Sequence, residues 1–473
     1  MNVTIQHYLG AAVTIALFVA LGVYSGKKVK TTDDFSISGR SASSIMVTGT
    51  ILGTMIGGAS TVGTAQTAFA TGISAWWFTL GGGIACLLFC LFFTGPFRRQ
   101  KHVTIPGIIE GEYGHQAGLA ATLFLSFSML VNIIPQIISA IALIVTFFPL
   151  QFSTAAVLAV GLMIVYVLFG GVWGAGMLGT AKTILTSASL LAGGALALRL
   201  FGGAGAMLSE LPRNPFFTFF VNKPGEDIST MISLLLGVLT GQIYLQAIIA
   251  ARSLRASRAG TLLSAVIGPL IGLGGVVIGL FMRVHHPEIA AVQALPLFIV
   301  RYLPAWLSGV VIATLFFAAI GTGAGLALSI CTILNREIYQ RLCPRADDRK
   351  NLAVSRILIL AVFGLSLAVV LMSGGEAMIL EWAYLSHGFR GVAAFLPMLT
   401  ALFLPGRISG KAGMWATICA PLAVLAWSIV KPLPVEPIFP GLAASLLLLA
   451  GGYLTSRKKA GAVQPVALRK GHS

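Results

Sequence analysis

The chain has 473 residues, of which 57% are hydrophobic and only 10% are charged, and its formal net charge is +17 at pH 7. This much apolar surface excludes an ordinary soluble protein, because apolar runs of about 20 residues, the length of a helix that crosses a bilayer core, recur from His7 onward. Since every backbone polar group in lipid must be paired within the protein, the composition predicts an all-α, polytopic membrane protein.

The apolar runs predict about 13 transmembrane helices. The first run has no positive segment ahead of it and no evident cleavage site, so we expect a retained span rather than a signal peptide. Prolines between several runs mark places where a helix cannot continue. With approximate limits, the predicted spans are residues 7–25, 43–70, 74–97, 118–148, 153–174, 179–201, 229–251, 261–282, 305–334, 352–373, 377–403, 411–430 and 439–455.

Two segments outside the predicted spans have a distinctive composition. Residues 202–227 hold Pro212, Pro215 and the pair Phe216-Phe217, and we expect them to fold back as a short surface helix or cover. The tail from Ser456 onward is basic and polar, and we expect it to be disordered.

Positive charge is distributed unevenly between the two sides of the predicted bundle. If the first span enters from outside, most of the 31 Lys and Arg residues fall in inner loops, and only Arg199, Arg213, Lys223, Arg283, Arg301 and Lys431 fall in outer loops. This bias predicts a multi-pass protein of the cell (plasma or inner) membrane, with its N-terminus outside and its C-terminus in the cytoplasm. The high net charge thus reflects topology and does not indicate a nucleic-acid partner.

After the first span, the predicted spans group as five, five and two. An odd number of spans in each group of five places the two groups in opposite orientations, as an inverted-topology repeat requires. The predicted organisation is an N-terminal extra helix and loop (1–42), a first five-helix repeat (43–202), an extracellular loop (203–228), a second five-helix repeat (229–404), two C-terminal helices (405–456) and a cytoplasmic tail (457–473).

The second predicted span contains Gly57 and Gly58, followed by small polar residues. Glycine costs a helix about 1 kcal/mol relative to alanine, so this pair favours local unwinding. Unwound backbone at membrane depth is tolerated where it lines a cavity, and there its carbonyl oxygens can bind a cation or a solute. The alternative is that these small residues only allow neighbouring helices to pack closely.

Polar side chains in several spans are candidates to line the same cavity. Asn132 and Gln136 lie one turn apart, with interhelical hydrogen bonding as the alternative role. Trp76 could instead belong to an interfacial aromatic belt. Arg390 could bind a solute carboxylate or pair with a backbone carbonyl. The predicted solute-binding set, with Tyr244 as a candidate gate, is Gly57, Gly58, Ser60, Thr64, Gln66, Trp76, Asn132, Gln136, Gln242, Tyr244, Gln246 and Arg390.

Several short motifs in a fixed order resemble the solute:sodium symporter family over residues 34–413. The resemblance implies a five-plus-five inverted repeat of the LeuT type, with one extra N-terminal and two extra C-terminal helices. It also implies alternating access that is driven in most members by sodium. The motifs include Asp34-Phe35, the segment Gly57–Gly63, Glu112-Tyr113-Gly114, Gly241-Gln242 and Asn335-Arg336-Glu337-Ile338-Tyr339.

The resemblance also implies a sodium site, which this chain retains only in part. The family usually has two adjacent hydroxyl side chains where this chain has Gly321 and Thr322, so one side-chain ligand is missing. An acidic residue associated with an accessory sodium site is replaced by Gly179. Carried over by position, the sodium ligands would be Ala59, Val62, Ala318, Gly321 and Thr322.

Lys182, near the inner end of the sixth predicted span, suggests another way to fill that site. Its ammonium group could replace sodium as a tethered cation and could bind and release a proton during transport. The alternative is that Lys182 snorkels to the cytoplasmic interface. Of the 14 acidic residues only Glu381 falls inside a span, so no carboxylate is placed at mid-membrane.

The sequence favours a symporter of a small organic solute, and the other function classes lack their signatures. No nucleophile or metal motif of an enzyme occurs, and no repeated filter of a channel. The five cysteines are scattered and form no metal site. We therefore expect no enzymatic activity and no cofactor beyond sodium or a proton as coupling ion. The expected partners are the solute and the lipid bilayer, with the protein acting as a monomer. A transporter-like solute sensor or binding protein is the alternative of another class.

Overall fold

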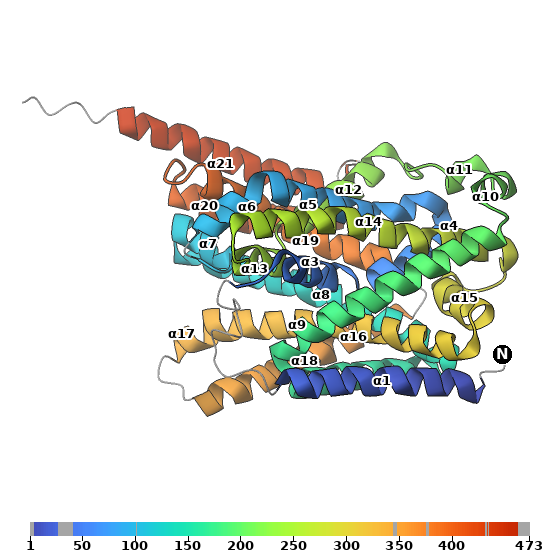
Figure 1. The fold of residues 1–473 in the computed structure, drawn as a ribbon. Helices are drawn as coiled ribbons and strands as arrows, with labels where there is room; N and C mark the ends of the chain where they lie inside the picture. Colours follow the sequence, from blue (N-terminus) through green and yellow to red (C-terminus); the bar gives the residue numbers. More distant parts are fainter. Residues whose placement is uncertain are drawn as a thin grey trace, which may run out of the picture.

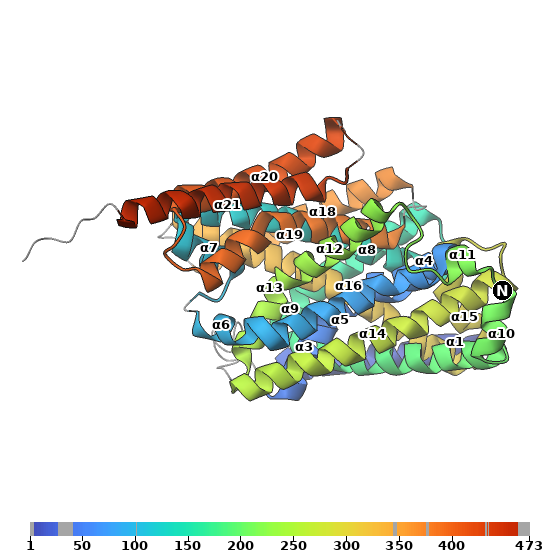
Figure 2. The same ribbon diagram turned by 90° about the horizontal axis from the view of Figure 1, so that it is seen from above.

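The computed structural model describes residues 4–26, 41–100, 102–343, 348–374, 378–430, 433 and 435–461. Within these ranges every regular element is a helix, which confirms the predicted all-α class. The long helices run roughly side by side in one bundle, and the chain crosses from one end of the bundle to the other many times (Figures 1 and 2). The predicted start of a disordered tail at Ser456 is wrong, because α21 continues to Gly461. The tail beyond residue 461 and the Asp34-Phe35 motif lie outside the described residues.

The helices fall into long α-helices and short connecting segments. The α-helices are α1 (Ile5–Gly26), α3 (Ser44–Met55), α4 (Thr64–Thr71), α5 (Trp77–Leu88), α6 (Thr94–Arg99), α7 (Ile105–Tyr113), α8 (His115–Phe147), α9 (Phe152–Leu200), α10 (Ala204–Glu210), α11 (Arg213–Phe216), α12 (Pro224–Leu239), α13 (Gln242–Ala250), α14 (Leu254–His285), α15 (Ala294–Tyr302), α16 (Ala305–Leu334), α17 (Gln340–Leu342), α18 (Asp348–Ser373), α19 (Ile379–Phe403), α20 (Gly410–Val430) and α21 (Ile438–Gly461). Between them lie the π-helices η2 (Ala59–Gly63), η4 (Phe89–Phe93) and η6 (Asn335–Tyr339), and the 3-10 helices η3 (Gly72–Trp76) and η5 (Ala291–Gln293).

The number of membrane spans is only partly established by helix length and apolarity. Among the described residues, eight helices are long and apolar enough to cross a membrane, or nine if the bent pair α12 and α13 is one span. The predicted total of 13 remains a prediction. Helix α9 carries one helical assignment over 49 residues, about 74 Å at 1.5 Å per residue, which is more than twice the bilayer core. Within it, Gly179–Leu200 is long and apolar enough to be a candidate span, and Phe152–Leu168 is a shorter apolar stretch.

Helix α8 lies at the centre of the bundle, because 89% of its most apolar window is buried inside the protein. It packs against α7, α9, α16 and α19. Helix α14 packs closely on its neighbours through small residues: a Cβ at Gly274 would lie 2.3 Å from the backbone oxygen of Leu190 in α9. Such close approach of backbones is typical of helix packing in membranes, where small residues replace a hydrophobic driving force.

Each predicted five-helix half begins with a broken helix. In the first half, α3 ends at Met55 and the chain resumes as η2 at Ala59. In the second half, α12 ends at Leu239, and α13 continues from Gln242 at an angle of 42°. The predicted cover between the halves is also helical, as α10 and α11, and the Trp77 indole N–H donates to Phe219 O within it at 3.0 Å. The two breaks place backbone groups that lack their usual helical partners inside the bundle.

Candidate functional site at the helix breaks

The first break is a sharp turn of the backbone at the end of α3. Ile56 is extended, with φ −91° and ψ 93°, although its N–H still donates to Leu52 O. Two hydroxyls then bind the carbonyl of the next residue: Thr61 Oγ1 donates to Gly57 O at 2.9 Å, and Ser60 Oγ donates to the same oxygen at 3.1 Å. The small polar residues after the glycines therefore stabilise the break itself.

The expected local unwinding at the glycine pair is present, and it is short. Only residues 56–58 leave the helix, and residues 59–63 form the wider π-helix η2, in which Gly63 N donates to Gly58 O. The physical reason is that buried carbonyl oxygens in lipid need donors, and local hydroxyl and amide groups supply most of them. The break thus exposes fewer free oxygens than a fully unwound segment would.

Helix α8 supplies the side chains that face this break. Gln136, which is 3% exposed, accepts a hydrogen bond from Gly58 N at 2.7 Å through its Oε1. Ser139 lies so close that a Cβ at Gly58 would be 2.4 Å from the Ser139 Cβ. Asn132, one turn before Gln136, is partly exposed. The one-turn spacing of Asn132 and Gln136 in the sequence selected Gln136 as a site residue. The sequence gave no reason to select Ser139.

The Lys182 ammonium group bonds to two of the residues to which the resemblance assigned a sodium ion. Lys182 is 5% exposed, and its Nζ donates to Thr322 Oγ1 at 2.9 Å and to Ala318 O at 3.3 Å. Both acceptors lie on α16 and belong to the predicted sodium ligands. A Cβ at Gly57 would lie 2.8 Å from Thr322 Oγ1, so the lysine and the first break meet at this threonine. Lys182 therefore does not snorkel to the interface.

The rest of the predicted sodium site is only partly available. Ala59 O accepts from the hydroxyl of Thr64 at 3.4 Å. A Cβ added at Gly321 would lie 3.5 Å from Lys182 Nζ and 3.6 Å from the Tyr166 hydroxyl, which is ordinary van der Waals contact. A hydroxyl side chain would fit at Gly321, yet the chain has none there. Nothing in the sequence pointed to Tyr166.

The second break is bordered by Arg390 of α19. The carbonyl of Gly237 loses its usual helical donor because the Gly241 N–H donates to Val238 O. The Arg390 Nε donates to Gly237 O at 3.0 Å, and Thr240 Oγ1 donates to it at 3.3 Å. Tyr244, which is buried, stacks on Phe89 with ring centroids 5.8 Å apart.

Three predicted solute-binding residues bind backbone elsewhere in the bundle. Gln66 Oε1 accepts from Ile379 N at the start of α19. Gln242 accepts from Ile105 N and donates to Val103 O, which ties α13 to the start of α7. The Trp76 indole donates to Pro269 O at 2.8 Å. These groups position helices, while Gln246 is partly exposed in α13.

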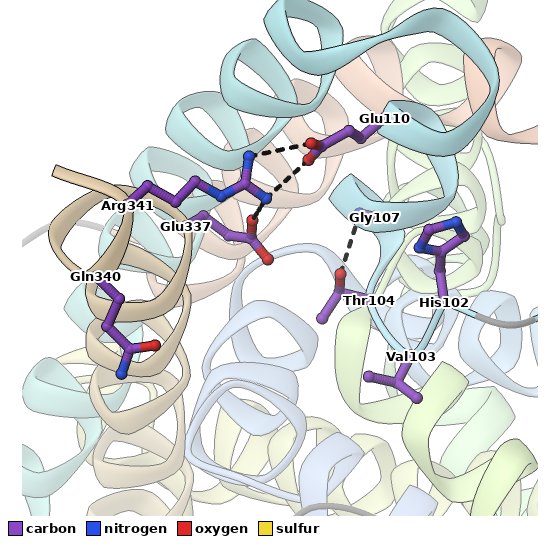
Figure 3. A pocket seen from close by; sticks show the side chains of 8 residues that line it. All are labelled: His102, Val103, Thr104, Gly107, Glu110, Glu337, Gln340 and Arg341. Atoms are coloured by element: carbon purple, nitrogen blue, oxygen red, sulfur yellow. Dashed lines mark hydrogen bonds and ion pairs between the residues drawn. The ribbon is translucent and has the colours of Figure 1, made fainter. Parts of the chain in front are cut away.

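A separate pocket of about 450 Å³ lies at the end of the bundle that carries α7 and α17 (Figure 3). Arg341 extends from α17 to Glu110 of α7, with its two terminal nitrogens 3.0 Å from the two carboxylate oxygens, and it also pairs with Glu337. The hydrogen bond from Arg341 holds the pKa of the Glu110 carboxyl below its ordinary value. Sequence reasoning missed this pocket, because its charges lie about 230 residues apart in the chain.

Comparisons with known proteins cover nearly the whole chain. A family model described as the sodium:solute symporter family matches residues 35–419. The chain is 24% identical over 475 residues to the sodium/sialic acid symporter SiaT of Proteus mirabilis, with 93% of each protein covered. It is 23% identical to the high-affinity proline transporter PutP of Bacillus subtilis, with 90% of this chain and 93% of that protein covered. The solved structure of a Na+-coupled sialic acid symporter matches with a TM-score of 0.77 at 19% identity, covering 97% of this chain and 98% of that chain. This match confirms the predicted LeuT-type fold.

Proposed function

The chain belongs to the sodium:solute symporter family, and we propose that it moves a small organic solute across the cell membrane by alternating access, with the solute bound at the two helix breaks. The observation that supports this solute site most directly is the hydrogen bond from Gly58 N to the buried Gln136, since it joins a broken helix to the central helix α8. Broken helices at membrane depth are where transporters of this architecture bind their cargo.

The geometry around Lys182 favours a tethered cation in place of the sodium ion. Lys182 Nζ bonds to Ala318 O and Thr322 Oγ1, which would otherwise help to hold sodium. A sodium ion at the same position would be repelled by the ammonium charge and would find only one of the two usual hydroxyls. We therefore propose that transport by this chain does not need sodium at this site, with a proton or the solute gradient alone as the driving force.

Uptake into proteoliposomes tests both parts of the proposal. The solute is first chosen by thermal shift of the purified protein against organic acids, amino acids and sugars, since ligand occupancy stabilises the folded state. Uptake of the radiolabelled solute is then measured with external sodium or with N-methylglucamine in its place. We expect wild-type uptake to persist without sodium, and Lys182→Gln to reduce it strongly because Ala318 O and Thr322 lose their cation.

A double substitution gives the sharper result. Lys182→Ala with Gly321→Ser removes the ammonium group and restores the adjacent hydroxyls, and the space around Gly321 accepts a side chain. We expect this variant to transport only in sodium. Lys411→Gln, which removes an exposed lysine at the start of α20, is the matched control and should behave as wild type. Wild-type uptake that collapses without sodium, together with unchanged uptake by Lys182→Gln, would exclude the tethered cation.

The remaining features of the proposed function concern topology and partners. We place the N-terminus outside and the C-terminus in the cytoplasm, so that the Arg341 pocket opens to the cytoplasm, on the basis of the positive charge in the inner loops. The protein acts as a monomer in the lipid bilayer. Binding of the solute in detergent without uptake into liposomes would instead identify a solute sensor.

A further inference from the structure

Arg390 is a buried cation beside the second helix break. Its side chain is 5% exposed, and its one hydrogen bond within the described part of the chain joins Nε to Gly237 O. A guanidinium group stays charged at any physiological pH and has five N–H donors in a planar fork. Four of these donors, on the two terminal nitrogens, therefore have no protein acceptor among the described residues.

The two terminal nitrogens of Arg390 are the part of the guanidinium group for which no protein acceptor is found in the described part of the chain. Because Nε is bound to the carbonyl, the end of the guanidinium group, which holds both terminal nitrogens, remains available. This end matches a carboxylate in a bidentate arrangement.

No acidic side chain of the two helices that hold Arg390 is placed to neutralise it. Glu381 of α19 lies nine residues before Arg390, about 13 Å along a helix, and Asp227 of α12 lies ten residues before Gly237, about 15 Å. Asp227 is already bound to Asn222. None of the ion pairs among the described residues includes Arg390.

The other polar groups near Arg390 carry no negative charge. Tyr244 and His387 lie close enough to interact with the guanidinium group electrostatically. His387 donates its Nδ1 hydrogen to Ala383 O at 2.7 Å. A buried cation without a counter-charge is expensive in lipid, and it is expected to face a cavity or a charged partner. The N-terminus of α13, which no side chain caps, lies at the same break, and the positive end of its helix dipole favours a bound anion there.

We infer that the solute is an organic anion whose carboxylate binds the terminal nitrogens of Arg390. This inference rests on the proposed transport function and specifies its substrate class. The second buried cation, Lys182, adds positive charge to the bundle interior and also has no acidic partner among the described residues. An anion therefore neutralises charge that no acidic side chain among the described residues balances.

Matched pairs of acids and amides test the inference in binding. The purified protein is titrated with acetate, lactate, benzoate and nicotinate and with the amide of each, and the thermal shift is followed at constant ionic strength. Because each amide keeps the shape of its acid and lacks the charge, we expect at least one acid to bind more than tenfold tighter than its amide. In Arg390→Gln this preference should disappear, a loss of about 10- to 100-fold in affinity for the acid.

Two further variants keep the test decisive. Arg390→Lys keeps the positive charge but lacks the planar pair of terminal nitrogens. We therefore expect weaker binding of the acid and unchanged binding of the amide. This variant still tests the inference if Arg390→Gln does not fold. Arg301→Gln, which removes an exposed arginine at the end of α15, should keep the full acid preference. Equal binding of acid and amide by wild type, absence of any acid-selective shift across the four pairs, or an intact preference in the Arg390 variants would each overturn the inference.

Transport measurements separate this inference from the proposed function. Acid-selective binding without uptake into proteoliposomes would contradict the transporter and leave the anion site standing. Uptake of a neutral solute that is unaffected by Arg390→Gln would contradict the anion site and leave the transporter standing.

Discussion

Single donors and acceptors at the two breaks determine what the site can bind. Gly58 N donates a hydrogen bond to Gln136, and Gly57 O accepts hydrogen bonds from the hydroxyls of Ser60 and Thr61. Lys182 binds two oxygens of α16, while Arg390 binds one carbonyl and keeps its terminal nitrogens free of protein acceptors in the described part of the chain. Most polar groups at the breaks therefore already have a hydrogen-bond partner within the protein. The distinguishing feature of the site is its two buried cations, Lys182 and Arg390.

Gly58→Ala tests the packing of the first break. The added methyl group would lie 2.4 Å from Ser139 Cβ and Oγ, so α8 and η2 must separate and the hydrogen bond to Gln136 must lengthen. We expect a loss of about 1–3 kcal/mol of stability, seen as a lower Tm of the purified protein, and loss of uptake. Gly364→Ala is the control, since nothing lies within 4 Å of its added methyl group, and there Tm should stay level or rise. An unchanged Tm in Gly58→Ala would contradict the described contact.

Helix α7 connects the two halves of the bundle at one end. Its start is fixed by Gln242 of α13, its Tyr113 hydroxyl lies 2.7 Å from that of Thr400 in α19, and Glu110 pairs with Arg341 of α17. Thr104 caps its first turn by accepting from Gly107 N, and Gly114, with φ 91°, ends it. These contacts tie α7 to three other helices, α13, α17 and α19, at one end of the bundle.

Glu110→Gln tests the ion pair at the Arg341 pocket. The pKa of Glu110 is depressed in the folded protein, so its stabilising effect is present above the unfolded pKa and is lost as the pH falls through the folded pKa. We expect a small loss of stability at pH 7, about 0.2–1 kcal/mol, because the pair is partly exposed. Melting curves of wild type and variant should converge as the pH falls toward 3 or as salt is added. A difference in Tm that is independent of pH would contradict this role.

The molecule as a whole has two predicted five-helix halves, and each of them begins with a broken helix. The breaks bring Gly57, Gln136 and Thr322 together in one region and place Arg390 against Gly237 in another. Helix α8 runs through the centre and contacts helices of both halves. Such a scaffold lets one group of helices move against another around a fixed site, as alternating access requires.

Cys343 provides a test of the proposed orientation. It is the exposed cysteine among the free cysteines of the described residues, and it follows α17 at the end proposed to face the cytoplasm. A membrane-impermeant maleimide should therefore label wild type in inside-out vesicles and leave right-side-out vesicles unlabelled. Cys343→Ser should abolish the signal. Labelling of right-side-out vesicles that depends on Cys343 would reverse the topology.

Local features of the sequence were enough to predict the class of the protein and part of its organisation. Apolar runs too long for a soluble core predicted an all-α membrane protein, and the glycine pair at residues 57 and 58 predicted a broken helix. Helical spacing selected Gln136, which lies against the first break, while its cavity-lining role stays a prediction. The ordered motifs resembled the family that the chain belongs to. These features are readable because bilayer thickness and glycine propensity act locally along the chain.

The pairing of the polar groups could not be predicted from the sequence and depends on the folded bundle. Residues far apart in sequence meet across the bundle, as Lys182 does with Thr322 and Glu110 with Arg341. The amides of Gln66 and Gln242 bind the starts of neighbouring helices, which no local pattern could predict. The physical reason is that a buried polar group must find a partner wherever packing places one, and packing depends on the whole fold.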